Sequence, residues 1–484
     1  MSITLDNFKK EYYKTDKKGV RTFFDVFRAF VGVLPFTSNT STCNYDKTCG
    51  IRGITGGFFR KCMDRQVKAI EDFEANAITP VKDYLKNERQ MRSDQIDTFV
   101  NVMKDIMYPD NTFTIIDSSF LKYIPLTTDK NQEKKSKKYK NGQEKIIDYL
   151  GSMLNPNEMI LNQLTNSPLN LFNDIIVSAL DIDGSFSKSK EGDEYLILPF
   201  IKESFCSDLK WLLSMEDSVI VKYIHVFLHF YLCYSLSQTL ANLDPRKCDE
   251  PIDGPTKMFY ILSSEHASVE CPAVVDGWSK HVSREAQEKL FGRMQTLDIL
   301  HSLLDNGKNI GFFHEVLSEY QKIDFTDDVK QQLETVLSLY QNDKRALLLN
   351  RETSKFTLPD LMDTSVTDYK DFIVKLGRLC TSLQSPEYST KMRDRINGIM
   401  KIRLLSTRRG MEILNLDDEM LFFLVAMLTR NKRTKLDDLY KKFSEYGILF
   451  DGSTHTAIEN YLLKLNLLEK KSDAGEAQYV KVIL

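Results

Sequence analysis

The sequence predicts a mainly α-helical protein that ends in a winged helix-turn-helix with a small β-hairpin wing. Two observations carry this prediction. Apolar residues recur at the three- and four-residue spacing of amphipathic helices along most of the chain. Within residues 415–484, three short helical patterns precede a hairpin pattern. That order of elements is typical of a winged helix, a helix-turn-helix variant that is common in nucleic-acid binding.

The length and composition predict several domains. A chain of 484 residues is too long for one ordinary hydrophobic core. Lysines crowd the stretch 127–145 among polar residues, so we expect no core there and interpret it as a flexible basic loop, either solvated or lying on nucleic acid. The expected segments are a helical domain at 1–126, the basic loop at 127–145, a middle helical domain at 146–350, a linker at 351–365, and a C-terminal helical region at 366–484.

Helical periodicity and punctuation by proline and glycine give the elements before the winged helix in order. The expected helices are 58–87 with a break near Pro80, 93–107, 144–154, 157–180, 201–215, 218–242, a series from 283 onward, 327–349, and 366–405. One strand-like run at 258–262 interrupts them.

Charge and cysteine usage restrict the classes of partner and compartment. The formal net charge is -3, so any contact with nucleic acid must be local. Eight cysteines at irregular spacing, with no signal-peptide pattern, indicate a reducing, cytoplasmic environment. The longest apolar run, 219–233, contains Lys222, His225 and His229 and is shorter than the roughly 20 residues of a membrane span, so we expect a buried helix and no membrane contact.

The winged helix is predicted from its own apolar stripes and caps. Its first helix follows Asn415 and Asp417, either of which can cap it. The second opens at Thr434 and stops at Gly447, and the third starts after Ser453. A strand, a turn and a return strand at 478–484 then form the wing.

Candidate nucleic-acid contacts fall into two groups. The outward face of the third helix carries Thr456, Glu459, Asn460 and Leu463, a poor set for reading bases because it has one acid, one apolar residue and no arginine. The basic residues beside it suit phosphate contacts better. We therefore expect contacts to phosphate at Lys432, Arg433, Lys435, Lys470 and Lys471. The residues that we expect to face the groove are Thr456, Asn460 and Lys464. A winged helix used for protein docking is the alternative, which the outward-facing Leu463 favours.

Patterns that suggest metal, nucleotide or thiol chemistry are incomplete. The glycine-rich stretch at 50–57 lacks the lysine of a phosphate-binding loop, so we interpret it as a turn before a helix. His225 and His229 have metal-ligand spacing without the glutamate of a zincin. The polar segment 263–281, with Cys271 and His281, is either a Cys-His site or a polar loop anchored by Trp278.

A nuclease is the remaining enzymatic alternative. Asp110 followed by Glu133-Lys134-Lys135 mimics the acid and lysine order of a magnesium-dependent nuclease, but its second half lies in the charged loop. Cys43, Cys49 and Cys62 do not show zinc-site spacing. We expect no catalytic residue, no metal and no cofactor.

A family resemblance adds what periodicity does not show. The run Tyr461–Val480, together with Asp417–Phe423, resembles the C-terminal end of the DptG family, and Val33–Phe36, Phe259–Leu262 and Gly277–Trp278 are also similar. The specific part of the match is the C-terminal tail. The resemblance implies a non-modifying subunit of a bacterial antiviral restriction system, one linked to DNA phosphorothioation. It also implies ATPase-type partners, DptF and DptH, and action against DNA that lacks the sulfur mark. It supplies no catalytic residues.

The sequence therefore predicts a non-catalytic subunit of a restriction complex. Its winged helix would contact double-stranded DNA, partner subunits, or both. The alternatives are a structural adaptor that does not touch DNA and the metal-dependent nuclease.

Overall fold

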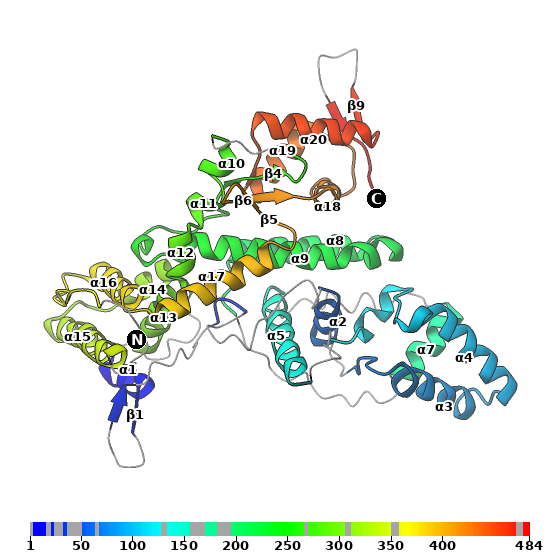
Figure 1. Ribbon diagram of the computed structural model, residues 1–484, viewed down its shortest axis with the longest axis horizontal. Helices are drawn as coiled ribbons and strands as arrows, with labels where there is room; N and C mark the ends of the chain where they lie inside the picture. Colours follow the sequence, from blue (N-terminus) through cyan, green and yellow to red (C-terminus); the bar gives the residue numbers. More distant parts are fainter. Residues whose placement is uncertain are drawn as a thin grey trace.

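The protein is mainly helical, as the sequence predicts, and most of its short strands lie in its C-terminal half (Figure 1). The computed structural model describes residues 3–15, 21–23, 32–35, 51–62, 67–126, 133–154, 170–181, 195–265, 270–304, 311–349, 358–470 and 478–484. Its largest cluster of buried apolar side chains includes residues from Ile3 to Val480. The predicted helices at 93–107, 201–215, 218–242 and 327–349 are confirmed to within two residues at each end.

The elements of the N-terminal part are mostly short helices. They are α1 (Leu5–Tyr12), β1 (Tyr13–Thr15), β2 (Arg21–Phe23), α2 (Ile51–Cys62), the π-helix η1 (Glu74–Ile78), α3 (Thr79–Asn87), α4 (Ser93–Met107), the 3-10 helices η2 (Pro109–Asn111) and η3 (Ser118–Tyr123), and α5 (Glu133–Gly151).

The middle part contains the longest helices. Its elements are α7 (Leu171–Leu180), α8 (Pro199–Leu213), α9 (Asp217–Asn242), the 3-10 helix η4 (Pro245–Lys247), β3 (Met258–Phe259), β4 (Ile261–Leu262), α10 (Pro272–Val275), α11 (Trp278–His281), α12 (Arg284–Glu288), α13 (Leu290–Leu303), α14 (Phe313–Tyr320) and α15 (Asp327–Leu349). The strand-like run at 258–262 is thus confirmed as two short strands.

The C-terminal part alternates helices with strands. It consists of α16 (Tyr369–Ser382), α17 (Pro386–Met400), β5 (Leu405–Arg408), β6 (Met411–Leu416), α18 (Asp418–Thr429), β7 (Thr434–Lys435), α19 (Leu436–Glu445), β8 (Ile448–Leu449), α20 (Gly452–Lys464), β9 (Leu468–Lys470) and β10 (Gln478–Val480).

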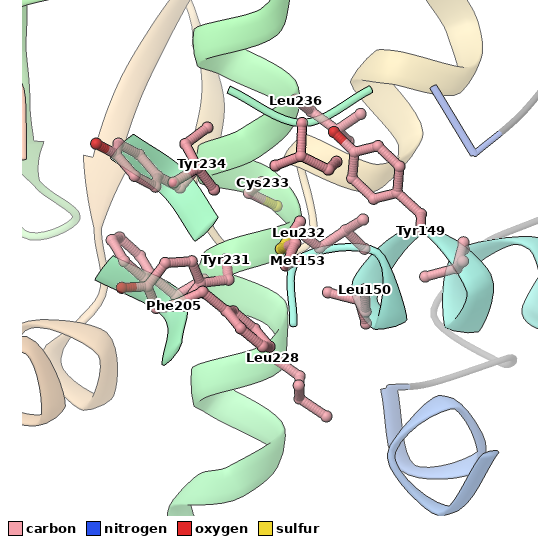
Figure 2. Packing of buried hydrophobic residues seen from close by; sticks show 14 of the residues in the cluster. Tyr149, Leu150, Met153, Phe205, Leu228, Tyr231, Leu232, Cys233, Tyr234 and Leu236 are labelled. Carbon is pink, nitrogen blue, oxygen red and sulfur yellow. The ribbon is translucent and has the colours of Figure 1, made fainter. Parts of the chain in front are cut away.

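Helix α9 is the central scaffold. Helices α18, α19 and α20 lie on one side of α8 and α9, and α2 to α5 lie on the other (Figure 1). Tyr149 and Leu150 of α5 pack against Leu232 and Leu236 of α9 (Figure 2). The helix is long and apolar enough to cross a bilayer, yet 78% of its apolar window is buried inside the protein. Core helices of globular proteins have this character.

The glycine-rich stretch and the predicted basic loop both differ in structure from what the sequence predicts. The glycine-rich stretch is not a turn, because Gly53, Gly56 and Gly57 lie inside α2. A Cβ added at Gly56 would overlap the backbone of Ile124, so the glycines allow close helix packing. Residues 133–145 of the predicted basic loop are the first part of α5, which ends on buried residues such as Leu150. An apolar stripe at its end supports this helix, whereas 127–132 lie outside the described residues.

Parallel strand pairs attach the middle of the chain to its C-terminal part. Met258 pairs with Ile448 in the β3–β8 ladder, and Ile261 pairs with Asn415 in the β4–β6 ladder. Strand β6 also forms an antiparallel hairpin with β5. These ladders position α18 and α20 relative to α9.

We predict that His229 makes the protein sensitive to acid. Burial, with smaller contributions from Arg403 and His225, lowers the pKa of His229 to about 3. The unfolded chain therefore takes up a proton near pH 6.5 that the folded chain refuses, so stability falls as the pH drops from 6.5 toward 3, by about 1.4 kcal/mol per pH unit. His229→Gln should flatten this slope in urea denaturation between pH 8 and pH 5. The difference between the two proteins in the free energy of unfolding at pH 8 measures lost packing alone. Parallel curves of this free energy against pH would refute the prediction.

Candidate nucleic-acid interface

The last seventy residues form three helices and a small sheet. Strands β7, β10 and β9 pair in that order, all antiparallel. The Asp417 carboxylate accepts a hydrogen bond from the Met420 amide and caps α18, as predicted. Asp451, rather than Ser453, caps α20 by accepting from the Thr454 amide at 2.8 Å. Thr434 does not cap the second helix, since it belongs to β7 and pairs with Val480.

A buried carboxylate anchors this region to the rest of the protein. Asp208 of α8 is 0% exposed. Its Oδ2 accepts hydrogen bonds from the hydroxyls of Tyr231 in α9, at 2.5 Å, and of Tyr446 after α19, at 2.6 Å. Its Oδ1 lies 2.6 Å from the guanidinium of Arg430, which follows α18 in the left-handed backbone conformation. Burial raises the pKa of Asp208, and Arg430 and the tyrosine hydroxyls oppose that rise.

Arg430 is therefore paired with a buried acid, although its side chain is 35% exposed. Its guanidinium also donates to Ser207, so it joins α18 to α8. Asn431 has a second structural task. Its side chain accepts from the amides of Ile483 and Leu484, both at 2.8 Å, and donates to the Leu484 carbonyl, which holds the tail against the end of α18.

The predicted phosphate contacts have different environments. Lys432 and Lys435 are exposed, and neither side-chain ammonium has a hydrogen-bonded or ion-paired partner within the described ranges. Arg433 crosses the sheet instead: its Nε donates to Glu469 at 3.1 Å, and its guanidinium lies 3.9 Å from the Tyr479 ring centroid. Lys470 is in β9 opposite Gln478, but its side chain lies outside the described residues, as does the whole of Lys471.

The predicted groove-facing residues lie on one exposed face. Thr456, Asn460 and Lys464 follow at four-residue intervals along α20, and all three are exposed. Glu459, which the sequence placed on the same face, is half-buried and accepts a hydrogen bond from Gln478 at 3.4 Å. This hydrogen bond ties the Glu459 side chain to β10.

Exposed apolar residues adjoin this face. Leu463 and Leu465, at the end of α20, are 41% and 43% exposed, and Val482 of the tail is 56% exposed. The Lys481 amide donates to the Leu467 carbonyl, so the tail runs beside the chain that follows α20. Outward-facing leucine is thus confirmed, which keeps a protein-docking role open.

The enzymatic patterns do not assemble in the described part of the chain. No group of three or more His, Cys, Asp or Glu residues is arranged there to hold a metal ion. His225 and His229 lie on α9, and burial lowers the pKa of each. Cys271 donates to Asp451, whereas His281 contacts Asp276 at 3.1 Å. Each therefore has its own acidic neighbour.

The nuclease pattern and the remaining cysteines give no assembled site either. Asp110 is exposed in η2, and Glu133 begins α5, but the side chains of 133–139 lie outside the described residues, as do Cys43 and Cys49. Burial raises the pKa of the Cys62 thiol to about 12, so this thiol stays protonated and unreactive at neutral pH. Trp278 is fully buried, which agrees with an anchored segment.

Comparison with known proteins adds no relative: neither the models of protein families nor the curated proteins match this chain. The residues and their geometry must therefore carry any functional proposal.

The residue that sequence reasoning missed is Asp208. The sequence feature that could have indicated it is an acid on the apolar side of α8, between Phe205 and Leu209, where an unpaired charge is costly. The sequence alone does not show which cation or hydroxyl would pair with it.

We predict that Arg430→Gln destabilises the fold in a pH-dependent way. Without the guanidinium, the pKa of Asp208 rises further, so the ionised carboxylate costs stability above that pKa and not below it. We expect a loss of about 3 kcal/mol at pH 7, which becomes smaller as the pH falls and Asp208 takes up a proton. Urea denaturation at pH 7 and at pH 5 measures the change.

The double variant Asp208→Asn with Arg430→Gln is the control, because it removes the titrating group. Its difference from Asp208→Asn alone should not vary over this pH range, because neither of these two proteins carries the titrating carboxyl, whereas the raised pKa of Asp208 makes the wild type itself titrate. An equal loss for Arg430→Gln at pH 5 and pH 7 would show that packing, not charge, is responsible.

Proposed function

We propose that residues 415–484 form a winged helix that contacts double-stranded DNA, and that the protein is a non-catalytic subunit of a bacterial DNA-restriction complex. The observation that carries the DNA contact is the exposed face of α20, where Thr456, Asn460 and Lys464 align and the nearest acid is held by Gln478. In the winged-helix arrangement this third helix is the one that enters a groove.

The neighbouring lysines supply the phosphate contacts. Lys432 and Lys435 are exposed and without ion-paired partners among the described residues, so their charge is available to a polyanion. Lys441 differs, because it pairs with Asp438 at 2.9 Å. Arg433 serves mainly to stabilise the sheet through Glu469 and Tyr479, although 42% exposure of its side chain leaves room for a phosphate.

The biological setting rests on the resemblance of 461–480 and 417–423 to DptG. Under this proposal the chain works with DptF- and DptH-like partners in the cytoplasm, in a system that restricts DNA lacking phosphorothioate. Cleavage then belongs to a partner subunit. A chain with a net charge of -3 and a few available cations is suited to a shared DNA contact more than to tight independent binding.

A structural adaptor is the second candidate, and the exposed Leu463, Leu465 and Val482 favour it. Apolar side chains that adjoin one another at a surface are typical of a protein interface. In that case α20 docks a partner through its end and the DNA contact is made elsewhere in the complex.

We predict that DNA binding by the full chain depends on salt through Lys432 and Lys435. In fluorescence anisotropy with a labelled duplex, between about 50 and 200 mM salt, replacing both lysines with glutamine should reduce the slope of log affinity against log salt by about 2. The affinity should fall similarly for unrelated duplexes, because phosphate contacts carry no sequence information.

The matched control replaces Lys322 and Lys441 with glutamine, since both are exposed and both are already paired with an acid. This control should retain the wild-type slope. No DNA binding by the wild type would reject the DNA contact, and an equal effect of both double variants would show that only overall charge matters. Magnesium-dependent nicking by the chain alone, lost in Asp110→Asn, would restore the nuclease alternative.

We predict that the apolar end of α20 is needed for partner binding if the adaptor role is correct. Leu463→Ser with Leu465→Ser should then weaken association with a purified DptF- or DptH-like partner by about tenfold or more, and should leave duplex binding unchanged. Leu361→Ser, another exposed leucine at 66% exposure, is the control. Isothermal calorimetry measures the association. Unchanged partner affinity in the double variant would reject docking at this end of α20.

A further inference from the structure

A cleft lies between α17 and the β5–β6 hairpin, away from the exposed face of α20. Its volume is about 760 Å³, within the range of about 300 to 1,000 Å³ that is usual for small-molecule sites. Helix α11 lies beside β6 and helix α12 lies beside α17 (Figure 1), and they contribute the lining residues Ser279 and Arg284. Its lining combines cations, acceptors and the apolar side chains of Val282 and Met411.

Glycine opens this cleft on the α17 side. Gly398 lines it from an exposed position in the last turn of the helix, and glycine is among the least favourable helical residues. Any side chain at this position would project from the helix surface that forms the wall. On the opposite wall, Gly410 has a φ of +80° in the hairpin turn, a conformation that favours glycine. Each of the two walls of the cleft thus carries one glycine, Gly398 and Gly410.

Two arginines line one end of the cleft, and two acids accompany them. Arg284 and Arg393 both approach the same oxygen of Glu288, at 2.7 and 2.8 Å. A second acid, Asp394, lies 3.7 Å from Arg393 and is 66% exposed, so solvent screens this longer contact. Two guanidiniums that share one carboxylate oxygen retain donors for an anion, and guanidinium is well matched to phosphate.

The floor, by contrast, offers acceptors. Glu412 accepts hydrogen bonds from Asn397 at 2.7 Å and from Gln287 at 3.3 Å. The amide oxygen of Asn397, which lines the cleft, has no hydrogen-bond partner among the described residues, and Asn397 is only 8% exposed. Buried acceptors without donors are costly, so the floor favours a group that brings N–H donors.

Helical spacing sets the distance between these two ends. Arg393 and Asn397 of α17 and Lys401, the residue after its end, follow at four-residue intervals, which separates neighbours by about 6 Å. Lys401 lies 3.5 Å from Glu412 and borders the floor. A matching ligand therefore has an anionic group at one end and N–H donors roughly one helical turn or more away, with an apolar body between them.

We propose that this cleft binds a nucleoside phosphate. Its phosphate lies on Arg284 and Arg393, the amino edge of its base faces Glu412 and Asn397, and the ring rests on Val282 and Met411. The proposal does not depend on the DNA contact of α20, because the two surfaces share no residue.

The test is a titration of the full chain with guanosine diphosphate that carries a fluorescent label on its ribose, followed by anisotropy. We expect saturable binding. Unlabelled nucleoside diphosphate should compete, whereas inorganic phosphate alone and nucleoside alone should each compete at least about tenfold more weakly, since each occupies one end. Stronger competition by a short single-stranded oligonucleotide than by the free nucleotide would show that the bound nucleoside phosphate is the end of a nucleic-acid strand.

Variants locate the site. Gly398→Leu should fill the cleft and weaken binding by about tenfold or more, and Arg393→Gln should do the same by removing a phosphate contact. Gly398→Ala should bind almost as the wild type does and should melt at a higher temperature, because alanine favours the helix. Lys391→Gln is the charge control, since Lys391 lies on α17, pairs with Glu387 and does not line the cleft.

Three results would overturn the proposal. They are no binding of the labelled nucleotide, equal competition by inorganic phosphate, and unchanged binding by a folded Gly398→Leu variant. Should Arg393→Gln fail to fold, the pair of Gly398 variants still decides the question, because neither alters a charge.

Discussion

The buried carboxylate of Asp208 is the interaction on which the C-terminal half depends. It joins α8, α9, the end of α18 and the residue after α19 at one point, through Tyr231, Arg430 and Tyr446. A charge in an apolar interior is tolerated only when donors surround it, and here a guanidinium and two hydroxyls do so. Because Arg430 leaves α18 in a left-handed conformation, the same contact directs the chain into 431–435, where the exposed lysines lie.

Polar side chains elsewhere in this region also bind neighbouring groups within the protein and leave the outer surface of α20 exposed to a ligand. The tail is held by Asn431, the acid of α20 by Gln478, and the start of α18 by Arg403, which contacts Glu419 at 2.6 Å. Each anchor satisfies a group that would otherwise compete for a ligand. What remains exposed on α20 and beside β7 is a small set of polar and cationic side chains, suited to a local contact with an anionic partner.

Helix α9 joins elements that are far apart in sequence. Its apolar residues face α2 and α5 on one side and α17 and α18 on the other, so neither half has to close its core alone. The parallel β3–β8 and β4–β6 pairs then bring 258–262 beside the C-terminal strands. Strand β6 consequently contributes both to the support of α18 and to the wall of the cleft beside α17.

The sequence by itself determined the helical class, the long helices α4, α8, α9 and α15, and the shared face of Thr456, Asn460 and Lys464. The physical reason is that helical periodicity relates residues three and four apart, so a short stretch of sequence is enough to show it. It did not reveal that Gly56 and Gly57 lie inside α2, because that depends on the close approach of Ile124. Only the tertiary structure decided which charged residues are available. Arg430 pairs with Asp208, Glu459 bonds Gln478, and Gly398 opens a cleft against β6, because these partners come from distant parts of the chain, Tyr446 and Asp208 being 238 residues apart.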